Sequence, residues 1–140
     1  MRFVSAALAA MLALAPLEAM ATPLCDAVNQ NLVSARSQFE RGAVRLPDAE
    51  CNTDGDGQLR CYYLNIRGSS AARERARAAA TEIGQCVAVE PVWDSAQRKF
   101  FIQAGTTRID INDFDNERHG WAVSINFNTE YYLSDDGDDW

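Results

Sequence analysis

The stretch Trp121-Ala122-Val123-Ser124-Ile125-Asn126-Phe127 decides the fold. Large apolar residues alternate in it with small or polar ones, so that every second side chain would point to the same side of an extended strand. The alternation therefore predicts a β-strand with one buried face and one polar face. An antiparallel sheet that is covered on a single face is the structure that gives this pattern.

Three earlier segments show a similar alternation and predict three more strands, over residues 87–93, 98–104 and 107–113. Short turn sequences separate neighbouring segments, as in β-hairpins. Together with residues 121–127, these segments predict a four-stranded antiparallel meander with one buried face.

Two further segments have the spacing of amphipathic helices. The first is expected to begin with Thr22 as the N-cap and Pro23 in the first turn, and to end at Gly42. The second is expected to run from an N-cap at Ser70 to a stop at Gly84. Their apolar stripes consist of Val28, Leu32, Ala35 and Phe39 in the first helix, and of Ala72, Ala76, Ala79 and Ile83 in the second. Two helices laid across one face of the sheet would bury both stripes, which predicts an α+β two-layer sandwich in the order helix, hairpin, helix, four-strand meander.

The four cysteines predict two disulfides, because an even number of cysteines in a small exported domain usually pairs. The turn Asn52-Thr53-Asp54-Gly55-Asp56-Gly57 predicts a hairpin with a three-residue loop, which places Cys51 opposite Cys61. Of the three possible connectivities, this register favours Cys51–Cys61. The second bridge, Cys25–Cys86, follows by elimination and would tie the first helix to the end of the second.

The first 21 residues predict a secretory signal peptide. Arg2 precedes an apolar run from Phe3 to Leu17, and Ala19-Met20-Ala21 is a small-x-small cleavage sequence. The run is shorter than the roughly 20 residues that span a bilayer as a helix. We therefore expect cleavage after Ala21, a periplasmic or secreted location, and one disulfide-braced domain over residues 22–133.

The charge of the chain lies mostly in its last quarter. Residues 22–109 carry eleven basic and ten acidic side chains, whereas residues 110–140 carry nine acidic side chains and only Arg118. Nucleic-acid and anionic-membrane binding are disfavoured because both require a basic surface. An acidic surface attracts cations or basic proteins, so a basic exported protein is the partner that we expect.

Residues 134–140 predict a disordered acidic tail. A pair of tyrosines lies shortly before it, and tyrosine is enriched at the energetically important positions of interfaces. The residues that we expect to contact a partner are Tyr131, Tyr132, Asp135, Asp136, Asp138 and Asp139.

Asn52, Asp54 and Asp56, followed by Gly57, resemble the start of an EF-hand calcium loop. Position 12 of that loop should be a bidentate glutamate, but here it is Tyr63, which cannot chelate in this way. A plain polar hairpin turn is therefore the favoured interpretation, and no metal or other cofactor is expected.

The segment from Asp113 to His119 contains three carboxylates and the single histidine of the chain, and it is expected to be a loop. Such a loop could hold a divalent metal or carry out acid–base chemistry. No nucleophile elbow, zinc-protease motif or phosphate-binding loop occurs elsewhere.

The sequence thus favours an exported, non-enzymatic binding or inhibitor-type protein with an acidic C-terminal surface for a basic protein partner. The first alternative is a small cell-envelope enzyme that uses the acidic and histidine-containing loop 113–119. The second is a calcium-stabilised structural module.

Overall fold

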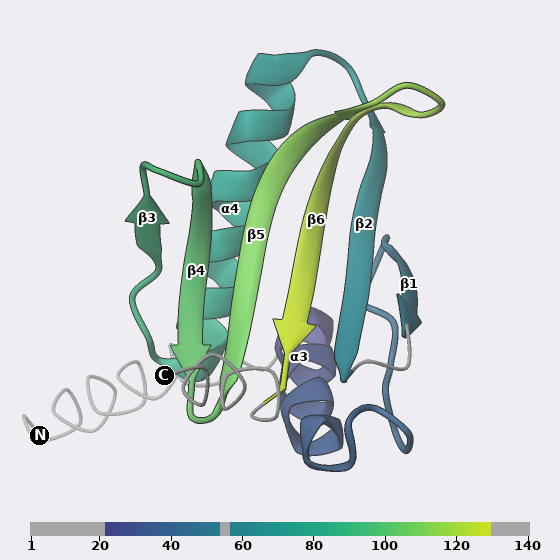
Figure 1. Cartoon of the computed structure of the whole chain (residues 1–140), viewed down its shortest axis with the longest axis vertical. Helices are drawn as coiled ribbons and strands as arrows, with labels where there is room; N and C mark the ends of the chain where they lie inside the picture. Colours follow the sequence, from purple (N-terminus) through teal and green to yellow (C-terminus); the bar gives the residue numbers. More distant parts are fainter. Residues whose placement is uncertain (1–21, 54–56, 130–140) are drawn as a thin grey trace, which may run out of the picture.

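The structure, a computed structural model, describes residues 22–53 and 57–129. The predicted signal peptide, Asp54 and Asp56 of the hairpin turn, and the whole segment 130–140 lie outside the described residues. The described residues fold into two α-helices and a six-stranded antiparallel sheet, so the predicted α+β class is confirmed (Figure 1).

The sheet has the strand order β1-β2-β6-β5-β4-β3. Its strands are β1 (Glu50–Thr53), β2 (Gln58–Ile66), β3 (Val92–Asp94), β4 (Lys99–Ala104), β5 (Thr107–Asn116) and β6 (Gly120–Asn128). The prediction of four strands was wrong because the hairpin β1–β2 does not stand apart from the sheet. Its second strand pairs along β6, with Cys61 opposite Ile125, and this makes β6 a central strand.

The strand predicted over residues 87–93 is mostly absent, because α4 extends to Val87 and only Val92–Asp94 pairs with β4. The loop predicted from Asp113 to His119 is also wrong. Strand pairing continues up to Asn116 opposite Gly120, so only residues 117–119 connect β5 to β6.

The helices are α3 (Pro23–Ser34), followed by the short 3-10 helix η1 (Ala35–Ser37), and α4 (Ser69–Val87). Helix α4 packs against β4, β5 and β6, and α3 packs against α4. In the view of Figure 1, α4 lies behind β4 and β5, and α3 lies behind the lower part of the sheet. The core between these layers includes Val28, Leu46, Ile83, Ile102, Ile109, Ile111, Val123, Ile125 and Phe127, each with no exposed surface.

Helix α3 begins as predicted but ends earlier. The Thr22 hydroxyl accepts a hydrogen bond from the Cys25 backbone N–H, which confirms it as the N-cap. The α-helix stops at Ser34, eight residues before Gly42, where the chain tightens into η1. The left-handed backbone conformations of Gln38 and Phe39 then end η1. This turn carries Phe39 back into the core, where its ring packs edge-on against Phe127.

A buried amide, which the sequence analysis did not single out, holds the segment after η1 against α3. The side chain of Asn31 is fully buried, donates a hydrogen bond to the Val44 carbonyl and accepts one from the Val44 N–H. The donor–acceptor distances of these two hydrogen bonds are 2.9 Å and 2.8 Å. They fix the start of the path that leads into β1.

The predicted ends of α4 were wrong at both sides. The N-cap is Gly68, whose positive φ starts the turn, rather than Ser70. At the other end the helix passes through Gly84 and is stopped by Ala88 in a left-handed conformation. The chain then folds back over Gly84, whose carbonyl accepts the Val89 N–H. Gly84 is thus needed for close packing and not as a helix stop.

Gly84→Ala is expected to destabilise the protein by roughly 1–3 kcal/mol, although alanine normally stabilises a helix interior relative to glycine. The added Cβ would lie 2.7 Å from the Val89 carbonyl oxygen and 3.0 Å from the Pro91 ring. Urea unfolding measures the effect, with the exposed neighbour Gln85→Ala as the control. A more stable Gly84→Ala protein would contradict this packing.

Both disulfides are present with the predicted pairing, Cys25–Cys86 and Cys51–Cys61. Cys51 lies opposite Cys61 in the β1–β2 ladder, as the turn register required. Since such bonds persist in oxidising surroundings, they indicate an extracellular or periplasmic compartment. Within the described residues, no helix has both the length and the apolarity to cross a membrane.

Candidate functional site

One face of the sheet is not covered by either described helix, and we call it the helix-free face (Figure 1). Strand alternation assigns its residues, because partners across a ladder share a face and the residues next to each core residue along a strand point the other way. On the three central strands these residues are Gln58, Arg60, Tyr62, Arg108, Asp110, Asn112, Phe114, Ala122, Ser124, Asn126 and Asn128. The face is therefore polar, with many amide side chains at its centre.

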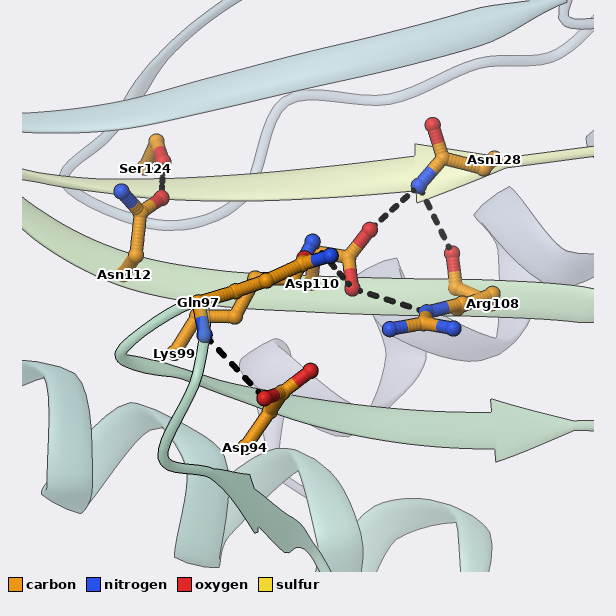
Figure 2. Close-up of polar contacts among 8 residues, drawn as sticks. All are labelled: Asp94, Gln97, Lys99, Arg108, Asp110, Asn112, Ser124 and Asn128. Carbon is orange, nitrogen blue, oxygen red and sulfur yellow. Dashed lines mark hydrogen bonds and ion pairs between the residues drawn. The ribbon is translucent and has the colours of Figure 1, made fainter.

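Asp110 organises the middle of this face (Figure 2). Its carboxylate accepts hydrogen bonds from Arg108 Nε at 3.0 Å and from Asn128 Nδ2 at 2.8 Å, and Lys99 Nζ lies 3.4 Å away. Only 8% of Asp110 is exposed, and its negative charge is balanced by the basic side chains of Arg108 and Lys99. The network joins β4, β5 and β6 and holds these side chains in fixed positions.

A second polar pair continues this central region. The Ser124 hydroxyl donates a hydrogen bond to Asn112 Oδ1 across the β5–β6 ladder. Next to Ser124 on the same face of β6 lies Asn126, whose Oδ1 is buried and has no hydrogen-bond partner among the described residues. A buried acceptor without a partner costs free energy, so this oxygen is a destabilising feature of the polar centre.

Aromatic rings flank the polar centre. The Arg108 guanidinium lies 4.3 Å from the centre of the Phe101 ring on β4. Toward the other end, Tyr62 and Phe114 pack edge-on, with ring centres 6.2 Å apart. Half-buried rings beside fixed polar groups are typical of protein recognition surfaces.

Asp94 fixes the turn at one border of this face. Its carboxylate accepts hydrogen bonds from the backbone N–H groups of Ala96 at 3.0 Å and Gln97 at 3.1 Å. Figure 2 shows the second of these bonds beside the Asp110 network. The turn thus holds β3 and β4 in register where Lys99 begins β4.

The predicted site over residues 113–119 does not form one constellation. Asp113 lies on the helix side of β5, where its carboxylate accepts a hydrogen bond from Arg73 Nε at 3.1 Å. His119 is exposed in the β5–β6 turn, and its backbone carbonyl accepts the Asn65 N–H. The part of the chain that the structure describes holds no group of three histidine, cysteine, aspartate or glutamate side chains suited to a metal ion.

Asn52, the first residue of the calcium-like loop, lies in β1 opposite Arg60. Strands rather than helices flank this turn, which is the arrangement of a β-hairpin and not of an EF-hand. The potential ligands Asp54 and Asp56 are not among the described residues.

The acidic last quarter of the chain is not one continuous surface. Asp110 and Asp113 are paired with basic side chains on opposite faces of the sheet. Asp115 and Glu117 are exposed near the β5–β6 turn, at the end of β6 opposite to that from which the chain continues past Thr129. Five of the nine acidic residues, with Tyr131 and Tyr132, fall in the segment 130–140 outside the described residues.

The chain matches no family model, curated protein or solved structure. Any interpretation of its surfaces therefore rests on their own geometry and chemistry.

One ionisable group away from the helix-free face has a shifted pKa. Burial raises the pKa of the Tyr63 phenol above its ordinary value of 10.0, and the neighbouring Arg75 partly opposes this rise. Arg75 also lies 4.0 Å from the centre of the Tyr63 ring. The phenol therefore remains protonated at neutral pH and acts as part of the packing between β2 and α4.

The Asp110 network was not predicted from the sequence. A signal was available, since residues 108, 110 and 112 and residues 124, 126 and 128 are all capable of hydrogen bonding and alternate with apolar residues. Their mutual contacts depend on the β5–β6 register, which places Arg108 opposite Asn128.

Asp110→Ala is expected to lower the free energy of unfolding by roughly 1–3 kcal/mol, because it leaves Arg108, Lys99 and Asn128 without their common acceptor. Asp110→Asn is the matched control, since it retains one acceptor oxygen and should cost less. Chemical unfolding of the three proteins measures the difference. Equal stability of Asp110→Ala and the unchanged protein would show that the network does not stabilise the sheet.

Proposed function

We propose that this protein is an exported, non-enzymatic binding or inhibitor-type protein that recognises a basic protein partner. The proposal takes the fold as a two-layer α+β sandwich, in which the helices cover one face of the sheet and leave the other for the partner. Residues 1–21 would direct export and be removed after Ala21.

The observation that supports this proposal most strongly is the position of β6. This strand lies at the centre of the sheet, contributes Ser124, Asn126 and Asn128 to the helix-free face, and continues directly into the acidic segment 130–140. A partner at that end of the face would therefore lie close to the start of a segment with five acidic side chains.

The two regions would contribute differently to binding. Acidic residues of the segment 130–140 would attract a basic partner over distances of about 10 Å and would raise the rate of association. Hydrogen-bonding groups of the helix-free face would act at short range. Because the face is a sheet of six strands about 5 Å apart, its shape suits a macromolecule rather than a small molecule.

Neither alternative function gains an observation in its favour. The enzyme hypothesis uses the acidic and histidine-containing loop 113–119, of which Asp113 is held by Arg73 on the helix side of the sheet. The calcium hypothesis uses Asn52, Asp54 and Asp56, and of these only Asn52 is among the described residues.

Capture experiments with the exported protein test the proposal. The immobilised protein is exposed to the exported-protein fraction of its host at about 50 mM and about 300 mM salt, and bound proteins are identified by mass spectrometry. We expect a basic protein to be captured at low salt and largely released at high salt. The absence of any specific partner at low salt would contradict the proposal.

Three variants then locate the surface on the identified partner. Asn126→Arg places a bulky cation at the centre of the helix-free face and should weaken binding by about tenfold or more. Gln85→Arg is the matched control, because the Gln85 side chain is exposed on α4 away from this face, and this variant should bind normally. Removal of residues 134–140 should weaken binding and reduce its salt dependence. Equal effects of the two arginine substitutions would exclude the helix-free face as the binding surface.

A further inference from the structure

A cleft of about 710 Å³ lies between the C-terminal end of α3 and the β4–β5 turn. Leu32, Val33 and Ala35 form an apolar strip along its α3 and η1 side. The rest of the lining is mixed and includes the polar residues Asn29, Gln38 and Thr107. Thr129, the last described residue after β6, also lies in its wall. The chain therefore leaves the described fold at this cleft.

The wall contains the most exposed large apolar side chain among the described residues. Val33 is 63% exposed, compared with 48% for Val92 and 41% for Trp93. A single exposed valine is ordinary on a protein surface. Here, however, it lies in a cleft together with the half-buried Leu32, and the most apolar part of the C-terminal segment follows Thr129 immediately.

The residues after Thr129 are close enough to reach the apolar strip of this cleft. Tyr131, Tyr132 and Leu133 are two to four residues beyond Thr129, so an extended chain could carry them at most about 14 Å from it. Arg36 also lines the cleft and makes no ion pair with another described residue. Glu130 precedes the tyrosines, and Asp135 and Asp136 follow them, which gives charge complementarity to this guanidinium.

We infer that residues 130–133 of this chain dock into the cleft against Val33, and that the acidic residues 134–140 project from there. The docked residues cover apolar surface of α3, which favours docking through the hydrophobic effect. This contact fixes the base of the acidic segment beside the end of β6. The inference concerns a contact within one chain and does not require a partner.

Hydrogen exchange of the exported full chain, followed by mass spectrometry, tests this contact. We expect backbone amides of residues 131–133 to exchange at least about tenfold more slowly than those of residues 136–140. Val33→Arg should remove most of this protection. Val92→Arg is the matched control, because Val92 is also an exposed valine but lies on β3 outside the cleft, and it should leave the protection unchanged.

Three results would overturn the inference. The first is equal exchange in residues 131–133 and 136–140 of the unchanged protein. The second is an equal loss of protection in Val33→Arg and Val92→Arg. The third is protection that grows with protein concentration together with dimer formation, which would place the segment in a second copy. Partner capture is measured separately, so loss of the proposed function would leave this test intact.

Discussion

A protein in which Cys25 and Cys86 are both replaced by serine is expected to lose about 4 kcal/mol of stability, the largest effect that we predict for a pair of substitutions. The bridge joins residues 61 positions apart, so its loss frees a long loop in the unfolded chain. It also releases α3 from the end of α4. For a domain of this size, the melting temperature should fall by about 15 °C or more.

The second bridge supplies a comparison within the same protein. Cys51 and Cys61 are only 10 positions apart, and replacing both by alanine should cost about 3 kcal/mol in the same chain-entropy treatment. Thermal unfolding of the two double variants measures the order of the effects. A larger loss for the Cys51–Cys61 pair would show that native contacts, rather than loop length, determine how each bridge stabilises the fold.

Phe127→Ala is expected to destabilise the protein by about 3–5 kcal/mol, because Phe127 is fully buried between the sheet and the helix layer. The cavity would also remove its edge-on contact with Phe39, whose ring centre lies 6.5 Å away. Since Phe39 is held by the left-handed turn after η1, the surrounding chain can collapse only partly into the cavity.

Phe101→Ala is the matched control for this prediction, since Phe101 lies on the helix-free face and is only partly buried. Its loss should cost about 1 kcal/mol or less, mainly from the contact with Arg108. Urea unfolding of both variants measures the contrast. Equal losses would mean that a second layer covers the helix-free face, and the surface proposed for a partner would then be buried.

These experiments test two separate features of the molecule. The disulfide variants test how much stability comes from the bridge between α3 and α4 and from the bridge between β1 and β2. The phenylalanine pair tests which face of the sheet is covered, on which the proposed partner surface depends. A protein that passes both tests would offer the helix-free face as a stable surface for recognition.

Local patterns were sufficient to predict several features of this protein. Alternation over residues 121–127 predicted β6 and its buried face, because side chains in a strand point alternately to the two sides. The Thr22 cap and the Cys51–Cys61 register were also predicted correctly, since each depends on residues close together in the chain. The class of fold followed from such signals, and the Cys25–Cys86 bridge followed by elimination once Cys51 was paired with Cys61.

Only the tertiary structure decided the other features, because they depend on residues distant in the sequence. Pairing of β2 with β6 made the sheet six-stranded and gave it a polar centre. Packing of Val89 and Pro91 over Gly84 let α4 continue past a glycine that would ordinarily end it. Asp113, which was expected in an acidic loop, lies in β5 and accepts a hydrogen bond from Arg73 on α4. The β5–β6 register brings Asp110 and Asn128 into contact. Periodicity in the sequence indicates which face of a helix or strand is buried. Contacts between distant segments determine which element packs against that face.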